Sequence, residues 1–240
     1  MISASLAWAL GIALIGGVVR GVTGFGGAMV MTPALSLMLG PLHAVMSVLL
    51  LEAFAATSML PAAARIANWR TLMPISLAAC ATLPFGGYLL VTADPTLLRR
   101  CIAATVIAFA LLLMTGFRYA GRQRLGTSVA VGSVSGVLVG ATSVGGPPVI
   151  LYLLSGPEPA AVTRANLTLY IAFISVAALV MMWARGILNA DSLLTALMLA
   201  IPFYAGVWMG GHVFGRISEP VFRRWTLVFL VAISSVILVV

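Results

Sequence analysis

The chain has 240 residues, of which 62% are hydrophobic and only 8% are charged, and its mean hydropathy is +1.17. About a quarter of the residues of a water-soluble domain are charged, so this composition excludes one and predicts an integral membrane protein. The net charge of +8 arises from thirteen arginines and no lysine. The arginines form no dense basic patch, which argues against nucleic-acid binding.

Ten apolar stretches follow one another, each bounded by charged or turn-forming residues. In chain order they are Leu6–Val19, Ala28–Leu39, His43–Leu60, Leu72–Val91, Cys101–Gly116, Thr127–Gly140, Val149–Leu154, Ala165–Trp183, Leu193–Phe214 and Trp225–Val240. A helix needs about 20 residues to cross a bilayer. The second and seventh stretches are too short for that, so they predict half-helices or the return limbs of re-entrant hairpins.

Two glycine-rich segments directly precede these short stretches. Residues 21–27 read GVTGFGG, and residues 140–146 read GATSVGG and are followed by Pro147 and Pro148. Helix breaks at corresponding points of two related hydrophobic halves are the sequence signature of a transporter binding site.

Further matches between the halves predict an internal duplication. The matching dipeptides are Gly26-Gly27 with Gly145-Gly146, Gly40-Pro41 with Gly156-Pro157, Pro84-Phe85 with Pro202-Phe203, and Asp94-Pro95 with Glu219-Pro220. We expect one integral membrane domain with a first repeat, residues 1–121, and a second, residues 122–240. The predicted fold is an all-α polytopic membrane protein with two homologous halves, each with a Gly-rich broken or re-entrant helix pair plus about three transmembrane helices.

The loop arginines discriminate between two topologies. If each break belongs to a single crossing, the halves are parallel, and the twelve loop arginines divide six to six between the two sides of the membrane. If each break is the tip of a hairpin that returns to its starting side, the halves are inverted and the split is nine to three. The nine are Arg65, Arg70, Arg118, Arg122, Arg124, Arg164, Arg216, Arg223 and Arg224, and the three are Arg99, Arg100 and Arg185. Positive-inside bias favours the inverted layout, with both termini outside the cytoplasm.

The first break predicts a group of free backbone donors. The helix after it begins with partial positive charge and unpaired N–H groups, which suit an oxyanion. The predicted substrate-binding residues here are Thr23, Gly24, Phe25, Gly26 and Gly27. Close helix packing through small residues is the alternative interpretation.

The second break predicts a less symmetric contribution, because Pro147 and Pro148 have no N–H to donate. Proline is well suited to the first turn of a helix, so the pair still marks a helix start. The hydroxyls of Thr142 and Ser143 would supply more of the polar contact. The predicted binding residues here are Thr142, Ser143, Gly145 and Gly146.

Three further polar residues lie within apolar stretches or directly beside them. Arg20 precedes the first break, and we expect it to supply countercharge for an anion. Alternatively, its side chain reaches toward the membrane interface or pairs with Glu52. Glu52 is the only carboxylate inside an apolar stretch, and it is either a proton carrier or a structural, hydrogen-bonded group. Asn166 would either hydrogen-bond the substrate or bridge helices.

No catalytic motif occurs in the sequence. There is no Gly-x-Ser-x-Gly elbow, no phosphate-binding loop and no cluster of His, Cys and carboxylates. We therefore expect no enzyme, no metal and no cofactor.

With these residues in view, the chain resembles the sulfite exporter TauE/SafE family of bacterial membrane permeases. The resemblance rests on residues 20–27 through Pro33, on Leu51-Glu52, on Asn68-Trp69-Arg70, and on residues 145–152. It implies transport of small sulfur-containing or organic anions, such as sulfite or sulfonates.

The expected function is that of a secondary transporter for a small anion in a bacterial inner membrane, with the lipid bilayer as its surroundings. The anion would bind near the midplane between the two breaks, and Glu52 would couple its movement to protons. A passive anion channel is the main alternative, followed by an intramembrane enzyme and a non-transporting scaffold. The sequence predicts no oligomeric state.

Overall fold

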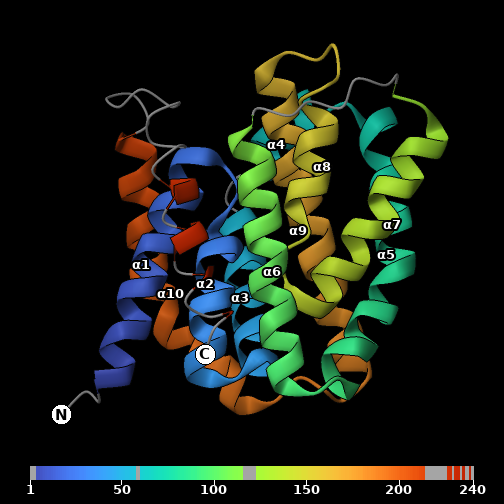
Figure 1. Ribbon diagram of the computed structural model, residues 1–240. Helices are drawn as coiled ribbons and strands as arrows, with labels where there is room; N and C mark the ends of the chain where they lie inside the picture. The colour runs from blue at the N-terminus through green and yellow to red at the C-terminus, as the bar shows by residue number, and fades with distance from the viewer. Residues whose placement is uncertain are drawn as a thin grey trace.

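The computed structural model describes residues 4–57, 60–115, 123–213, 226–228, 230–232, 234–235 and 238. Its named helices are α1 (Ala4–Thr23), α2 (Gly27–Leu39), α3 (Pro41–Thr57), α4 (Leu60–Ile66), α5 (Trp69–Thr92), α6 (Pro95–Met114), α7 (Leu125–Thr142), α8 (Gly146–Leu153), α9 (Ala160–Ala184) and α10 (Ala190–Val213). Helices stand side by side in one bundle (Figure 1), and no strand occurs among the described residues. The predicted all-α architecture is confirmed.

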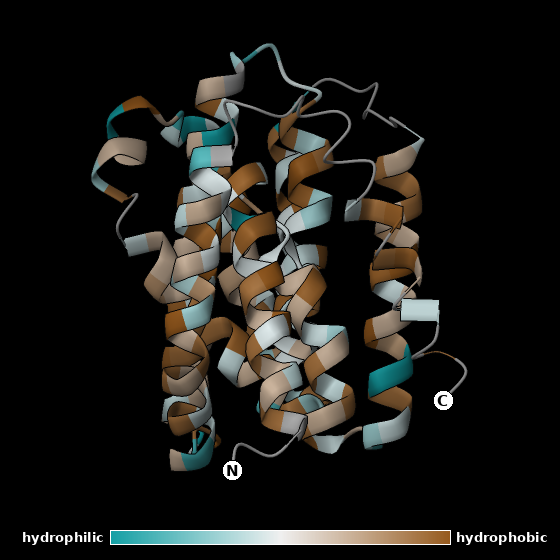
Figure 2. Cartoon of the chain, turned by 90° about the vertical axis from the view of Figure 1, so that its left-hand side faces the viewer, coloured by the Kyte–Doolittle hydropathy of each residue, from teal (hydrophilic) through white to brown (hydrophobic). Residues whose placement is uncertain are grey.

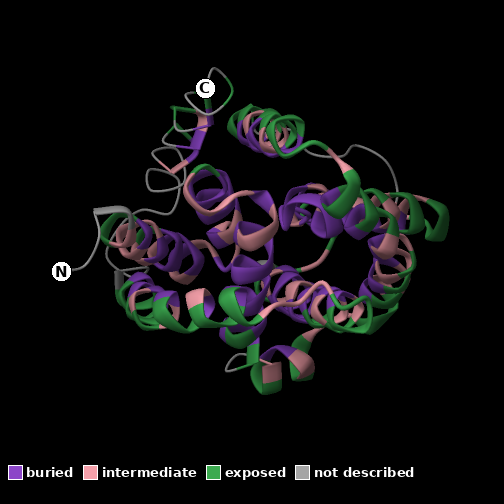
Figure 3. Cartoon of the chain, turned by 90° about the horizontal axis from the view of Figure 1, so that it is seen from below, coloured by how far each residue is buried: buried purple, intermediate pink, exposed green. Residues whose placement is uncertain are grey.

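The bundle has the surface of a membrane protein. Within the described ranges, six helices are long and apolar enough to cross a membrane, namely α1, α5, α6, α7, α9 and α10. Large apolar side chains such as Trp8, Trp183 and Ile201 are 72–80% exposed on the outside. Hydrophilic residues gather mainly at the two ends (Figure 2), and the buried residues face the centre (Figure 3). Such an outer surface is solvated by lipid, so the chain is a multi-pass membrane protein.

Most helices begin before the predicted apolar stretches, and in α5 and α6 a polar residue caps the first turn. Asn68 Oδ1 accepts the N–H of Arg70 at 3.1 Å, and Asp94 Oδ1 accepts that of Thr96 at 2.9 Å. These contacts satisfy donors that a helix N-terminus leaves unpaired. A scan of hydropathy alone passes over such residues. The hydropathy scan also did not predict the short helix α4, which follows the third apolar stretch.

Some predictions fall outside the described residues. They are most of the tenth stretch, the repeat boundary at residue 121, the Glu219-Pro220 match, and Arg118, Arg122, Arg216, Arg223 and Arg224. The internal repeat therefore stays a prediction.

Both glycine-rich segments are tips of antiparallel helical hairpins. In the first, a Cβ at Gly16 would lie 2.5 Å from Met31 Cγ, and one at Gly27 would lie 3.3 Å from the carbonyl of Gly16. In the second, the Tyr152 hydroxyl lies 2.7 Å from Ser128 Oγ. Helix α2 thus runs back along α1, and α8 runs back along α7. Both breaks are therefore turns between antiparallel helices, and the return of each hairpin to its starting side of the membrane stays a prediction.

The long arm of each hairpin packs against one further helix through glycines. On α1, a Cβ at Gly17 would overlap the carbonyl of Phe203, and one at Gly21 would overlap that of Val207. The register advances in the same direction on both helices, so α1 and α10 run parallel. Only glycine permits backbones to approach this closely, as in many membrane bundles.

The second seam repeats this arrangement between α5 and α7. A Cβ at Gly132 would overlap the carbonyl of Ile75, and one at Gly136 would overlap that of Ala79. These two helices are therefore parallel as well. Each hairpin is fixed along a helix that lies distant in sequence, which holds the two tips in a defined relation.

Candidate functional site

The first break consists of residues 24–26, between α1 and α2. Gly24 and Gly26 have φ angles of +77° and +90°, in the left-handed region that glycine adopts at low cost. The Thr23 hydroxyl bonds to the carbonyl of Val19 at 2.7 Å or to that of Phe25, and it accepts the Phe25 N–H at 3.2 Å. Its first role is therefore to satisfy the interrupted backbone rather than to stay free for a ligand.

The second break, residues 143–145, uses the same device. The Thr142 hydroxyl donates to the carbonyl of Leu138 at 2.7 Å and accepts the Val144 N–H at 3.1 Å. Ser143 turns the chain with a φ of +57°. Helix α8 then begins at Gly146 with proline in its first turn, as predicted.

The tip of the second hairpin lies beside helix α2, the short arm of the first, in the protein interior. Ser143 Oγ is 2.6 Å from Thr32 Oγ1 in α2, and both side chains are buried. A narrow cavity of about 30 Å³ lies between the hairpins. Residues of both breaks line it, together with residues of neighbouring helices, and these lining residues include Phe25, Gly26, Ala28, Glu52, Ser143, Val144, Gly146, Tyr170 and Ser175. The structure thus brings both breaks to one cavity.

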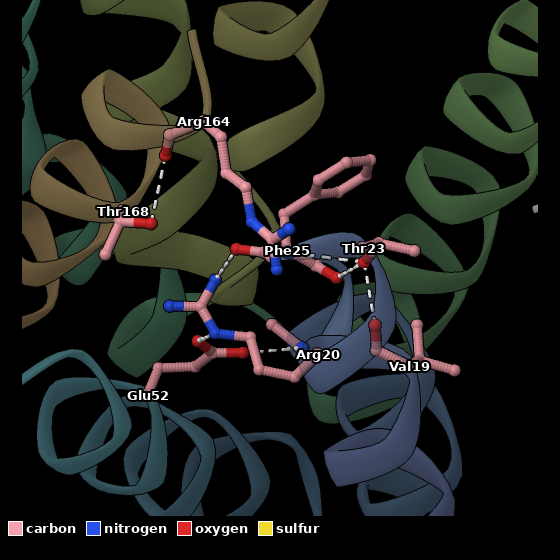
Figure 4. A network of polar contacts seen from close by, with 9 residues as sticks. Val19, Arg20, Thr23, Phe25, Glu52, Arg164 and Thr168 are labelled. Atoms are coloured by element: carbon pink, nitrogen blue, oxygen red, sulfur yellow. Dashed lines mark hydrogen bonds and ion pairs between the residues drawn. The ribbon is translucent and has the colours of Figure 1, made fainter. Parts of the chain in front are cut away.

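A buried ion pair occupies the N-terminus of α2. Arg20 Nε lies 3.1 Å from Glu52 Oε2, and the two residues are only 3% and 4% exposed. Glu52 Oε1 accepts the Ala28 N–H at 3.1 Å, while Arg20 Nη1 donates to the carbonyl of Gly24 (Figure 4). The Arg20–Glu52 pairing considered from the sequence is present. The Ala28 N–H, a donor at the start of α2, is therefore not free for a substrate in this structure, because a carboxylate of the protein accepts it.

Gly27 makes this arrangement sterically feasible. A Cβ at this position would lie 2.7 Å from Glu52 Oε1, which is closer than two such atoms approach. Gly27 was predicted as a substrate-binding residue. In the structure it also leaves the space in which the Glu52 carboxylate reaches the N-terminus of α2.

Comparison with known proteins gives one result. A family model described as Sulfite exporter TauE/SafE matches residues 9–237. The chain belongs to the sulfite exporter TauE/SafE family. No curated protein and no solved structure shows a significant match. Membership confirms the resemblance seen in the sequence and assigns the chain to a class of membrane transporters for sulfite-like anions.

In this TauE/SafE protein a second arginine reaches the first break. Arg164 Nη2 lies 3.5 Å from the carbonyl of Gly21, and a Cβ at Gly24 would lie 3.1 Å from Arg164 Nε. Figure 4 shows its guanidinium near the break, opposite that of Arg20. Sequence reasoning counted Arg164 as a loop residue. The proline-bounded start of α9 at Ala160, which puts Arg164 in its second turn, was the available signal.

Asn166 bridges helices and is not among the residues that line the cavity. Its Oδ1 accepts the backbone N–H of Asn68 at 2.9 Å, and Asn68 Nδ2 donates to Glu158 at 2.6 Å. The bridging interpretation is therefore realised in the structure. Any contact of Asn166 with a substrate remains a prediction.

A polar chain that the sequence did not reveal supports the second break. The hydroxyl of Tyr170, a cavity-lining residue of α9, donates to Ser135 Oγ at 2.6 Å. Ser135 in turn donates to the carbonyl of Gly145. Tyr170 is fully buried. Gly145 thus contributes an anchored carbonyl, whereas Ser143 and Gly146 face the cavity.

Proposed function

We propose that this TauE/SafE protein is a secondary transporter that moves a small anion, a sulfur-containing oxyanion or an organosulfonate, across a bacterial inner membrane. One observation carries the proposal: residues of both helix breaks line the same buried cavity. Broken helices that meet in the interior, with helix N-termini directed at an anion, are the usual construction of such sites.

The proposed anion site lies between the two breaks. Gly26, Ser143 and Gly146 face the bound anion from the cavity wall, and Arg20 supplies positive charge from behind the first break. Thr23, Gly24, Phe25, Gly27, Thr142 and Gly145 shape the two turns, and Asn166 acts from α9. Arg164 joins this set as a second cation. Two guanidiniums near one break favour an anion over a neutral solute.

Movement of one hairpin against the other would expose the cavity to each side in turn. The chain contains no nucleotide-binding loop, so the proposed driving force is an ion gradient or the membrane potential. Glu52 is the proposed proton carrier, because it is the titratable carboxylate on the cavity wall.

Counterflow in proteoliposomes tests the function. Vesicles preloaded with sulfite should take up labelled sulfite faster than empty vesicles, and uptake should saturate. Thiosulfate, sulfonates and small carboxylates in the same assay define the substrate class, with protein-free vesicles as the control. Uptake that rises linearly with concentration and gains nothing from preloading would indicate a passive channel instead.

Glu52→Gln tests proton coupling. The variant should carry out sulfite exchange but should no longer accumulate sulfite in response to a pH gradient, since an amide does not exchange a proton. Asp191→Asn, which removes an exposed carboxylate on α10, should keep the gradient response. Full retention of that response in Glu52→Gln would rule out the coupling role.

A further inference from the structure

The carboxylate of Glu52 holds the position that the proposed function assigns to the substrate. We infer that Glu52 is a tethered competitor: when ionised it occupies the donors of the first break, and when protonated it leaves them to the incoming anion. One proton then enters the site with each anion bound. The inference rests on the proposed function, because it names the group that the substrate must displace.

The contacts of Glu52 are those that a small oxyanion would make. One oxygen accepts the Ala28 N–H at the N-terminus of α2, and the other lies 3.1 Å from the guanidinium of Arg20. Helix N-termini bind anions through such free N–H groups and their partial positive charge. An incoming sulfite or sulfonate group and the carboxylate therefore need the same donors.

The site is shaped to admit this carboxylate. Gly27 leaves the space that a Cβ would fill, at 2.7 Å from Glu52 Oε1. Glu52 also lines the cavity between the breaks. The carboxyl group thus stands between the buried donors and the cavity, and its rotation away from Ala28 would open the helix end to that cavity.

The ion pair leaves hydrogen-bonding capacity unused. Arg20 Nη2 and Glu52 Oε2 are buried, and neither has a hydrogen-bond partner within the described part of the chain. A buried donor without a partner is costly, and more so on a charged group. A purely structural ion pair would satisfy this donor, whereas a pair that awaits a further acceptor would not. An oxyanion has oxygens enough to bond Arg20 through it.

The local charge explains why a proton must accompany the anion. Among the described residues, the charged groups at the break are Arg20 from α1, Glu52 from α3 and Arg164 from α9, and Tyr170 from α9 lines the same cavity. Helices α2 and α7 carry no titratable residue, and those of α5, α6, α8 and α10, like His43 of α3, are not among the residues that line the cavity. The three charges sum to +1 with Glu52 ionised and to +2 with Glu52 protonated. Two anions on the same donors repel each other, which favours protonation of one of them.

Proton uptake on binding tests the inference. Thiosulfate and methanesulfonate are the probes, because neither takes up a proton near neutral pH. The purified full-length protein in weakly buffered detergent solution should take up about one proton per anion bound, as a pH-indicator dye reports. Glu52→Gln should take up none and should bind the probe at least about tenfold tighter, a change of about 1.4 kcal/mol. Asp191→Asn should match the wild type in both measurements.

The outcomes separate the inference from the proposed function. Anion binding by the wild type without proton uptake would overturn the inference and leave the transporter proposal intact. If the folded Glu52→Gln variant binds the probe anions more weakly than the wild type, the inference is likewise overturned and the transporter proposal stays intact. If Glu52→Gln aggregates on size-exclusion chromatography, the proton count of the wild type decides alone. Absence of binding of sulfite, thiosulfate and sulfonates to the wild type would contradict both.

Discussion

At the scale of single residues, the site depends on a cation that has two tasks. Arg20 bonds a backbone carbonyl of the break with one nitrogen and lies beside Glu52 with another. The guanidinium is planar and always charged, and its donors point in fixed directions. It therefore fixes the turn and the carboxylate relative to each other, which a single ammonium group could not do.

Arg20→Gln should abolish saturable sulfite uptake and lower stability, because Glu52 would remain buried without its partner. The loss of one member of a buried pair costs about 3–5 kcal/mol. Uptake in proteoliposomes and a thermal size-exclusion assay measure the two effects. Arg185→Gln, at the exposed end of α9, should leave both unchanged. Normal uptake by Arg20→Gln would remove this arginine from the site.

Gly27→Ala separates the helix end from its carboxylate. The added methyl group would meet Glu52 Oε1, the mobile end of a side chain, so the protein should fold but lose the contact with Ala28. The same methyl group would keep an incoming oxyanion from the Ala28 N–H, so we expect uptake to fall by about tenfold, a change of about 1.4 kcal/mol. Gly126→Ala, where a Cβ meets nothing within 4 Å, should keep wild-type uptake. Equal uptake by the two variants would contradict the assigned role of Gly27.

At the scale of elements, the glycine seams determine where the hairpins stand. Residues 132, 136 and 140 recur at the spacing of one helix face, so α7 meets the backbone of α5 along its length. Lipid provides little hydrophobic force between helices, and close packing of this kind replaces it.

Gly136→Ala should force α5 and α7 apart, since its Cβ would overlap a backbone carbonyl that has no room to move. Overpacking of this kind costs about 1–3 kcal/mol. The thermal size-exclusion assay should show a clear loss of stability. Gly11→Ala on α1, which meets nothing within 4 Å, is the matched control. A stability equal to that of the control would show that the seam tolerates separation.

The same elements show what the sequence could and could not predict. The breaks were found because glycine and proline interrupt apolar runs, and the hairpins followed from the shortness of the next stretch. The Arg20–Glu52 contact was considered because both residues are rare in such runs. The proline before α9 indicates that Arg164 lies in a helix. Its approach to the break, like the Tyr170–Ser135 chain, could not be found, because both depend on how α9 is rotated against the breaks. A single hydropathy profile contains no information on that rotation.

At the scale of the whole molecule, the described arginines lie toward the two ends of the bundle, apart from Arg20. Arg65, Arg70, Arg124 and Arg164 lie near the starts of α5, α7 and α9, and Arg99, Arg100 and Arg185 lie near the ends of α5 and α9. The grouping agrees with the inverted layout. Five of the nine arginines that the inverted layout assigns to the cytoplasmic side lie outside the described residues, so the orientation in the membrane stays a prediction.

A disulfide between the hairpins should stop transport if the hairpins move against each other. Thr32 and Ser143 have hydroxyl oxygens 2.6 Å apart, which is within the reach of a disulfide. After replacement of Cys80 and Cys101 by alanine, the Thr32→Cys/Ser143→Cys variant should lose counterflow on oxidation and regain it on reduction. Each single cysteine variant serves as a control. Full counterflow in a quantitatively cross-linked protein would exclude this motion.

The narrow space between the hairpins has a consequence for the cell that carries the protein. Its 30 Å³ holds about two water molecules. Two waters span only a small part of a bilayer about 30 Å thick, so this space does not by itself form a continuous file of water for protons. A carrier that rests in this form would insulate the membrane and preserve its voltage, and it would admit charge only when a solute wedges the hairpins apart.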